Sequence, residues 1–118
     1  MDLAGKLQTM DAALAVVNAP KGFAWTGPVA KDPKSAKAVL VFMRNADELR
    51  AFSAPLVAAA RRGAIAYLAY PKAGQLGTDL NRDNIWVMLQ EQGIRPVRQI
   101  AIDDVWSALR FRPGDDEP

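Results

Sequence analysis

The sequence predicts an α/β domain of three layers, with about five strands in a mostly parallel sheet that ends in an antiparallel hairpin. Three continuous apolar runs of strand length stand at residues 12–17, 38–43 and 64–70. None of them alternates apolar with polar residues, which is typical of parallel strands covered by helices on both faces. The last two strand-like segments are joined so briefly that only an antiparallel pair fits them.

The first predicted strand, residues 12–17, follows a short helical turn around Leu3 and Leu7. The connection after it, residues 19–37, is long for an irregular loop in a compact domain. One interpretation is that it contains a helical turn near residues 23–25. The sequence alone leaves the structure of this connection open.

A helix with clear start and stop signals lies between the second and third strands. Asn45 is a suitable N-cap, and Glu48 three residues later completes a capping-box-like pair. Apolar residues then follow at helical spacing, namely Leu49, Phe52, Leu56 and Ala60. Gly63 suits the position just after the last turn. Because Pro55 cannot donate a backbone hydrogen bond, we expect a kink there or two short helices.

A second helix is predicted over residues 81–92. Thr78, Asp79 or Asn81 could cap its start, and Gly93 ends it. The residues expected to face inward are Ile85, Met88 and Leu89.

The last two predicted strands, residues 95–102 and 105–112, are joined by Asp103 and Asp104. Side chains alternate between the two faces of a strand. In the second of these strands, one face carries Val105, Ser107, Leu109 and Phe111. The opposite face carries Trp106, Ala108, Arg110 and Arg112, so we expect it to be partly wet.

The length of 118 residues suits one domain, which we assign to residues 1–112. Residues 113–118 carry three acidic side chains and little that could be buried, so we interpret them as a flexible acidic tail. The whole chain has 15 Lys and Arg against 13 Asp and Glu, a net charge of +2. Without the three tail acids the body is +5, which is weakly basic beside dedicated nucleic-acid binders.

Cysteine and histidine are both absent from the sequence. Their absence excludes disulfides, thiolate or imidazole metal sites and Ser–His nucleophile pairs. What remains is carboxylate, lysine, arginine or tyrosine chemistry, or none, and this argues against an enzyme. The longest charge-free runs, such as residues 51–60, fall well short of the roughly 20 residues that span a bilayer. No signal-peptide pattern is visible at the N-terminus, so we expect a cytoplasmic protein with no membrane segment.

Several short motifs are spread along nearly the whole chain. They are Asn18-Ala19-Pro20 with Gly22-Phe23, Tyr70-Pro71-Lys72, Asp79-Leu80-Asn81-Arg82-Asp83 with Ile85-Trp86, and Ile102-Asp103 with Trp106-Ser107-Ala108-Leu109-Arg110-Phe111-Arg112. Together they resemble a family of short bacterial proteins that is classified only as a domain of unknown function. The resemblance implies a bacterial protein and brings no catalytic residues with it.

The element order of strand, helix, strand, helix and hairpin resembles the C-terminal half of class I methyltransferases, whose Rossmann-like fold binds S-adenosylmethionine. Residues 60–70 are similar to the helix end, glycine and strand that precede the last helix of that fold. The resemblance implies a three-layer Rossmann-like arrangement with the last antiparallel strand beside the third strand. The first strand, however, is followed by a single glycine, Gly22, and no acidic partner is nearby. The cofactor site is therefore incomplete by this comparison, and we expect no cofactor.

A candidate binding site follows from the predicted topology. In an open α/β sheet, ligands gather outside the carboxyl ends of the parallel strands. Those ends carry Asn18, Lys21, Arg44, Tyr70 and Lys72. Three of these residues are basic, so the edge could hold a small anionic ligand or a nucleotide. The alternative is ordinary loop charge.

Other polar segments have structural explanations. Residues 71–78 join a strand to a helix and contain two glycines, but Lys72 precedes both, which argues against a phosphate-binding loop. Lys72, Asp79 and Asp83 could form an acid–base set, although helix capping and ion pairing explain the two carboxylates better. A lysine recurs at every third position of the long connection, namely Lys31, Lys34 and Lys37. Aromatic residues are not interleaved with these lysines, so we expect a solvated face rather than contact with nucleic acid.

Aromatic residues support a different kind of function. Trp86 and Trp106 fit packing roles, but together with Tyr67 and Phe111 they could instead cover a partner surface. An antiparallel strand at a sheet edge would also invite pairing with a second copy. The leading hypothesis is a non-catalytic α/β domain that acts by homodimerisation or by binding a protein partner. The alternative is a module for a small anionic ligand at the carboxyl edge of the strands.

Overall fold

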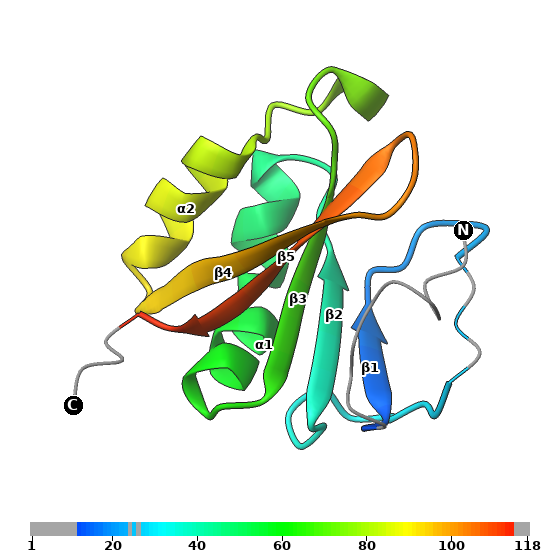
Figure 1. The fold of residues 1–118 in the computed structure, drawn as a ribbon, viewed down its shortest axis with the longest axis vertical. Coiled ribbons are helices and arrows are strands. Elements are labelled where there is room, and N and C mark those ends of the chain that lie inside the picture. The colour runs from blue at the N-terminus through cyan, green and yellow to red at the C-terminus, as the bar shows by residue number, and fades with distance from the viewer. Residues whose placement is uncertain (1–11, 24, 26, 115–118) are drawn as a thin grey trace.

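Five strands form one mixed sheet in the order β1-β2-β3-β5-β4 (Figure 1). The computed structural model describes residues 12–23, 25 and 27–114. Its elements are β1 (Leu14–Val17), β2 (Ala38–Phe42), α1 (Ala46–Arg61), β3 (Ile65–Pro71), the short 3-10 helix η1 (Gln75–Gly77), α2 (Arg82–Gln90), β4 (Ile94–Ala101) and β5 (Trp106–Pro113). The predicted turn around Leu3 and Leu7 and residues 115–118 of the predicted tail lie outside the described residues.

The pairing of the strands confirms the α/β class and the terminal hairpin. β1 pairs with β2 and β2 with β3 in parallel, whereas β5 pairs with both β3 and β4 in antiparallel. The described sheet is therefore mixed, with as many antiparallel as parallel neighbours. β5 lies between β3 and β4, which is the strand placement expected above.

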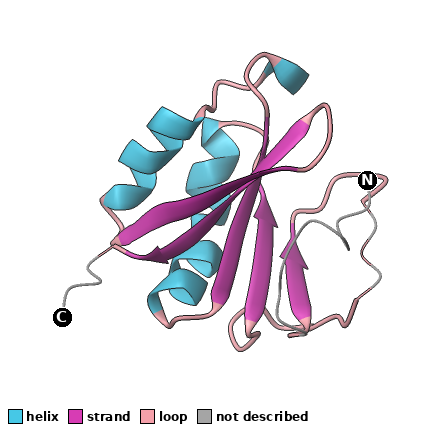
Figure 2. Ribbon diagram, viewed as in Figure 1, coloured by secondary structure: helices cyan, strands magenta, loops and turns pink. Residues whose placement is uncertain are grey.

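Both described α-helices lie on the same face of the sheet (Figures 1 and 2). Side chains of α1 and α2 form one apolar cluster with strand residues such as Val41, Leu68 and Phe111. A second cluster on the opposite face holds Leu40 and Tyr67, with loop and hairpin residues packed against it. The described part of the chain thus shows two layers, and the predicted third layer of helices is not found in it.

The second face is covered in part by aromatic packing instead. Phe23, from the long connection, meets Phe42 of β2 edge to face, with ring centroids 5.1 Å apart. Phe42 in turn meets Trp106 of β5 in the same manner at 5.3 Å. Among the described residues these ring contacts cover part of the second face without a helix, so a continuous apolar run does not by itself require helices on both faces.

The caps of α1 follow the predicted signals. Asn45 accepts a hydrogen bond of 2.9 Å from the backbone N–H of Glu48. Glu48 reaches back to the backbone N–H of Arg44, one residue earlier than in a standard capping box. The helix runs through Pro55 as one element, so the expectation of two short helices is wrong.

The long connection between β1 and β2 lies partly along the outer side of β1. Leu14 and Val29 form an isolated parallel bridge, and the backbone N–H of Ala30 donates to the carbonyl of Leu14 at 2.9 Å. A hydrogen bond from the N–H of Phe23 to the carbonyl of Pro20 closes a turn just after β1. The helical turn predicted near residues 23–25 falls partly outside the described residues.

The hairpin alternates as predicted. Leu109 and Phe111 of β5 face the helices, whereas Trp106 and Ala108 face the opposite side. Asp103 shapes the turn because its carboxylate accepts hydrogen bonds from the backbone N–H groups of Val105 and Trp106. None of the described helices is both long and apolar enough to cross a membrane.

Candidate functional site

Glu48 is the centre of the polar contacts at the carboxyl ends of β1 and β2. Its Oε1 accepts hydrogen bonds of 2.9 Å from the side-chain amide of Asn18 and from the backbone N–H of Arg44. Its Oε2 accepts from Nε and Nη2 of Arg44 at 2.8 and 2.6 Å. The Glu48 side chain is only 16 % exposed, so this carboxylate is held in one place by four donated hydrogen bonds.

Asn18 reaches Glu48 because of its backbone conformation. Its φ of +59° lies in the left-handed region, which asparagine tolerates better than most residues. From there its amide nitrogen donates to the carbonyl of Phe42 as well as to Glu48, both at 2.9 Å. The side chain thereby joins the ends of β1 and β2 to the first turn of α1.

These contacts shift the pKa of both charged groups. The hydrogen bonds from Arg44 are the main reason that the pKa of Glu48 is lowered, and the hydrogen bond from Asn18 acts in the same direction. Partial burial opposes the shift. The pKa of Arg44 is raised by the same pairing with Glu48. The pair is therefore ionised at neutral pH.

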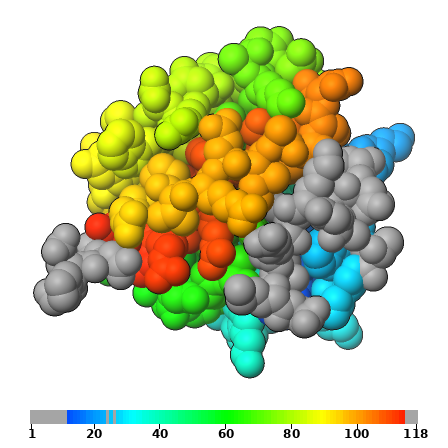
Figure 3. Space-filling model, in the orientation of Figure 1, coloured from blue at the N-terminus to red at the C-terminus, as the bar shows by residue number. Residues whose placement is uncertain are grey.

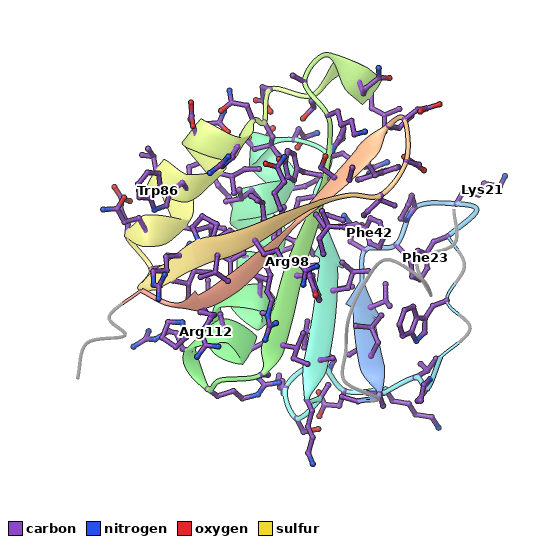
Figure 4. All side chains as sticks on the ribbon, in the orientation of Figure 1. Lys21, Phe23, Phe42, Trp86, Arg98 and Arg112 are labelled. Atoms are coloured by element: carbon purple, nitrogen blue, oxygen red, sulfur yellow. The ribbon has the colours of Figure 1, made fainter. Side chains whose placement is uncertain are left out.

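The geometry leaves little of the predicted anion site free. The guanidinium of Arg44 already binds Glu48 through two nitrogens. Lys21 is exposed and points away from the sheet (Figure 4). Lys72 is half-buried, and its backbone N–H donates to the carbonyl of Val105 at 2.6 Å. Of the five predicted residues, Asn18 and Arg44 share a partner: both side chains donate hydrogen bonds to the carboxylate of Glu48.

Tyr70 lies at the carboxyl end of β3, beside the end of β2, but its side chain faces the helices. Its side chain is buried in the cluster under the helices, and its hydroxyl accepts a hydrogen bond of 3.3 Å from Gln99 of β4. Burial raises the pKa of this phenol, and the nearby charge of Arg82 partly opposes that effect. A buried, protonated tyrosine is a packing residue with one satisfied hydroxyl.

The two carboxylates considered for acid–base chemistry lie at the N-terminal ends of helices. Asp79 accepts a hydrogen bond of 2.8 Å from the backbone N–H of Ala46 and so caps α1 rather than α2. Asn81 caps α2 in a reciprocal capping box with Asn84. Asp83 lies in the first turn of α2, where a negative charge interacts favourably with the helix dipole. The structural explanation preferred from the sequence therefore fits these contacts.

The four aromatic residues considered for a partner surface differ in their exposure to solvent. Tyr67, Trp106 and Phe111 are buried, so they pack the core. Trp86, by contrast, is 48 % exposed on the outer side of α2 (Figure 4). Of the two roles considered for Trp86, packing or covering a partner surface, its exposure favours the second.

Four arginines of the terminal hairpin stand opposite one another in two pairs that the sequence did not predict. Arg98 lies opposite Arg110, and Arg95 opposite Arg112, in the ladder between β4 and β5. The sequence predicts that Arg110 and Arg112 lie on a partly solvent-exposed face of β5. Which β4 residues stand opposite them depends on the register shift between Pro96 and Arg98. Bulges of this kind have no reliable sequence signal, so facing pairs could not be predicted.

The described residues contain no group of three or more acidic side chains placed to hold a metal ion. Comparison of the chain with protein-family models, curated proteins and solved structures finds no match.

Proposed function

We propose that this domain is a non-catalytic binding module that associates with a second copy of itself through the outer surface of α2. The observation that carries the proposal is the exposure of Trp86, at 48 %, next to Val87 at 60 %. Tryptophan is among the residues that contribute most to protein interfaces, because a large ring is removed from water there. On a helix of nine residues, two adjacent exposed apolar side chains form a compact contact surface.

The partner that best fits the exposed surface of α2 is a second copy of the chain. A hollow of about 350 Å³ lies beside Trp86 and is lined by Gln90, Gly93, Ile94, Arg95 and Gly114. In a twofold dimer the same surface meets itself, so each copy must offer both a projecting group and a place that receives it. On the surface of α2 the projecting ring of Trp86 lies beside the hollow that could receive the partner's ring, which supports a homodimer.

Pairing through the free edge of β4 has less support. Pro96 has no backbone N–H to donate, and the ladder is irregular between Pro96 and Arg98. Proline and bulges are two means by which natural proteins discourage pairing between sheet edges. The proposal therefore assigns association to α2 and not to the edge strand.

Light scattering on the full chain, over a range of micromolar concentrations, tests this function. We expect the wild-type mass to approach twice the 12.8 kDa of one chain and Trp86→Ala to stay monomeric. Leu76→Ala is the matched control, because it removes another exposed apolar side chain, from η1, and should leave the dimer intact. A monomeric wild type, or equal loss of mass in both variants, would contradict the proposal.

A further inference from the structure

A hollow between the two α-helices combines side chains of opposite charge. It measures about 480 Å³ and lies on the helix side of the sheet, whereas atoms of β4 and β5 form the surface of the opposite side (Figure 3). α1 and α2 pack mainly on strands and not on each other, which leaves room between them. The residues that line the hollow are Leu49, Arg50, Ser53, Met88, Glu91 and Gln92. We call this hollow the helix cleft.

Helical spacing brings the lining residues of each wall together. Residues three or four positions apart are neighbours on the surface of a helix. On α1, Ser53 follows Leu49 by four positions and Arg50 by three. The other wall has the same spacing, from Met88 to the two residues that follow α2. Each wall therefore offers one apolar side chain, one charged side chain and one neutral polar side chain.

A buried hydroxyl joins the two walls of the helix cleft. Ser53 is only 6 % exposed, and the other buried residues of α1 are all apolar. Its Oγ accepts a hydrogen bond of 3.5 Å from Nε2 of Gln92. A hydrogen bond of this length is weak. A polar group of a ligand can therefore replace it at little cost to the fold.

The two charges of the helix cleft belong to opposite walls. Within the described residues Glu91 makes no ion pair and no side-chain hydrogen bond. Arg50 donates from Nη1 to Asp47 at 3.1 Å, but these two side chains are 65 % and 95 % exposed. Such an exposed pair contributes little to stability, and it uses one of the five guanidinium N–H groups. Arg50 therefore keeps donors for a ligand carboxylate while its bond to Asp47 stays in place.

We propose that the helix cleft binds a small zwitterion with an apolar side chain, as found in free α-amino acids and short peptides. The ligand carboxylate accepts from Arg50, its ammonium group donates to Glu91, and its side chain lies against the apolar residues of the walls. A simple anion would be repelled by Glu91 and a simple cation by Arg50, so the two charges together select a molecule that carries both. The volume lies within the range of small-molecule pockets, roughly 300–1,000 Å³.

The helix cleft is separate from the surface proposed for dimerisation. Met88 follows Trp86 by two positions, about 200° around the helix, so their side chains lie on nearly opposite flanks of α2. Trp86 lines a different hollow. We therefore expect Trp86→Ala to abolish the dimer and to leave ligand binding unchanged. This variant distinguishes a failure of one proposal from a failure of the other.

Two-dimensional NMR of the isotope-labelled full chain tests the proposal, because it both measures and locates weak binding. The main probe is L-leucine. Isocaproate is leucine without the amino group, isoamylamine is leucine without the carboxylate, and glycine has both charges but no side chain. Leucyl-leucine carries its two charges farther apart and represents a short peptide.

Matched variants test each wall of the helix cleft. Arg50→Gln and Glu91→Gln each remove one charge from it. Lys34→Gln and Asp104→Asn are the controls, since they remove the same charges from exposed positions outside it. Circular dichroism should give all four variants nearly the same unfolding temperature, which separates lost binding from lost folding.

We expect L-leucine to shift the backbone signals of residues 49–53 and 88–92 in a saturable way. Isocaproate, isoamylamine and glycine should each bind at least about fivefold more weakly. Arg50→Gln and Glu91→Gln should weaken leucine binding by at least about fivefold, and the controls by less than about twofold. Asp47→Asn should tighten binding by about twofold, because it releases Arg50 from its exposed pair.

The remaining outcomes identify the source of the ligand or overturn the proposal. Leucine binding more tightly than leucyl-leucine assigns the cleft to free amino acids, and the reverse order assigns it to short peptides. Isocaproate or isoamylamine binding as tightly as leucine would overturn the proposal, because one charge would then be enough. Equal weakening in the controls, or no saturable shift at residues 49–53 and 88–92 with either zwitterion, would overturn it too.

Discussion

The side-chain amide of Asn18 donates a hydrogen bond of 2.9 Å to the carboxylate of Glu48. One residue follows β1 directly and the other lies in the first turn of α1, so the bond spans 30 positions of the sequence. The same amide nitrogen also donates to the carbonyl of Phe42 at the end of β2. The polar side chains at the carboxyl ends of β1 and β2 thus bind one another and the start of α1, so they have a structural role.

Substitution of Asn18 should separate its side-chain contacts from its backbone role. Asn18→Ala loses both donated hydrogen bonds and also places an ordinary residue at a φ of +59°. We expect a loss of about 2 kcal/mol in the free energy of unfolding. Asn18→Gly loses the same hydrogen bonds but relieves the backbone, so its loss should be about 1 kcal/mol. Urea unfolding followed by tryptophan fluorescence measures both values.

The informative result is which of the two variants has the lower free energy of unfolding. A glycine variant as unstable as the alanine variant would show that the left-handed backbone contributes no strain. Two variants as stable as the wild type would show that the amide contacts are unimportant in solution.

Acid should weaken the fold through Glu48. Its pKa in the folded chain lies below its ordinary value of 4.5, so the carboxylate stabilises the fold above that pH. This stabilisation is lost as the pH falls through the lowered folded value. Glu48→Gln should cost about 1 kcal/mol at pH 7 and progressively less below about pH 4.5. Urea unfolding at several pH values measures the difference, and a difference that is constant with pH would contradict this assignment.

Local signals in the sequence were enough to predict most of the elements. Asn45 and Gly63 mark the ends of α1 correctly, because capping depends on a few neighbouring residues. The third layer was predicted from apolar runs, which report that a face is buried but not what covers it. In the described residues, loop contacts such as Phe23 on Phe42 cover part of the second face, and no pattern within the strands distinguishes such a contact from a covering helix.

The candidate site was harder to predict than the fold. Topology placed Asn18 and Arg44 at the same edge, and they do lie together. Whether a cation there is free depends on side-chain partners, and Glu48 was recognised only as a cap of the helix. The facing arginines depend on the register of a bulged strand, in which one extra residue moves Arg98 to the other face. Single-residue register is the property that sequence patterns determine least.

Small anions should find no site at the carboxyl edge of the parallel strands. Because Arg44 already binds Glu48, Lys21 and Lys72 are the two that remain of the three cations predicted for this edge. We expect S-adenosylmethionine, nucleotides and acyl-CoA to give no rise in unfolding temperature that depends on Lys72. A thermal-shift screen of the wild type and Lys72→Ala measures this. A clear stabilisation that disappears in Lys72→Ala would instead support a small anionic ligand at this edge.

Removing Arg110 should stabilise the isolated chain. Arg110→Leu eliminates a buried donor, Nε, that has no hydrogen-bond partner. It also extends the apolar surface beside Tyr67. We expect the free energy of unfolding to rise by about 1 kcal/mol. Lys34→Leu, in an exposed loop, is the control and should change stability by less than about 0.5 kcal/mol. A loss of stability in Arg110→Leu would mean that the guanidinium is satisfied in solution.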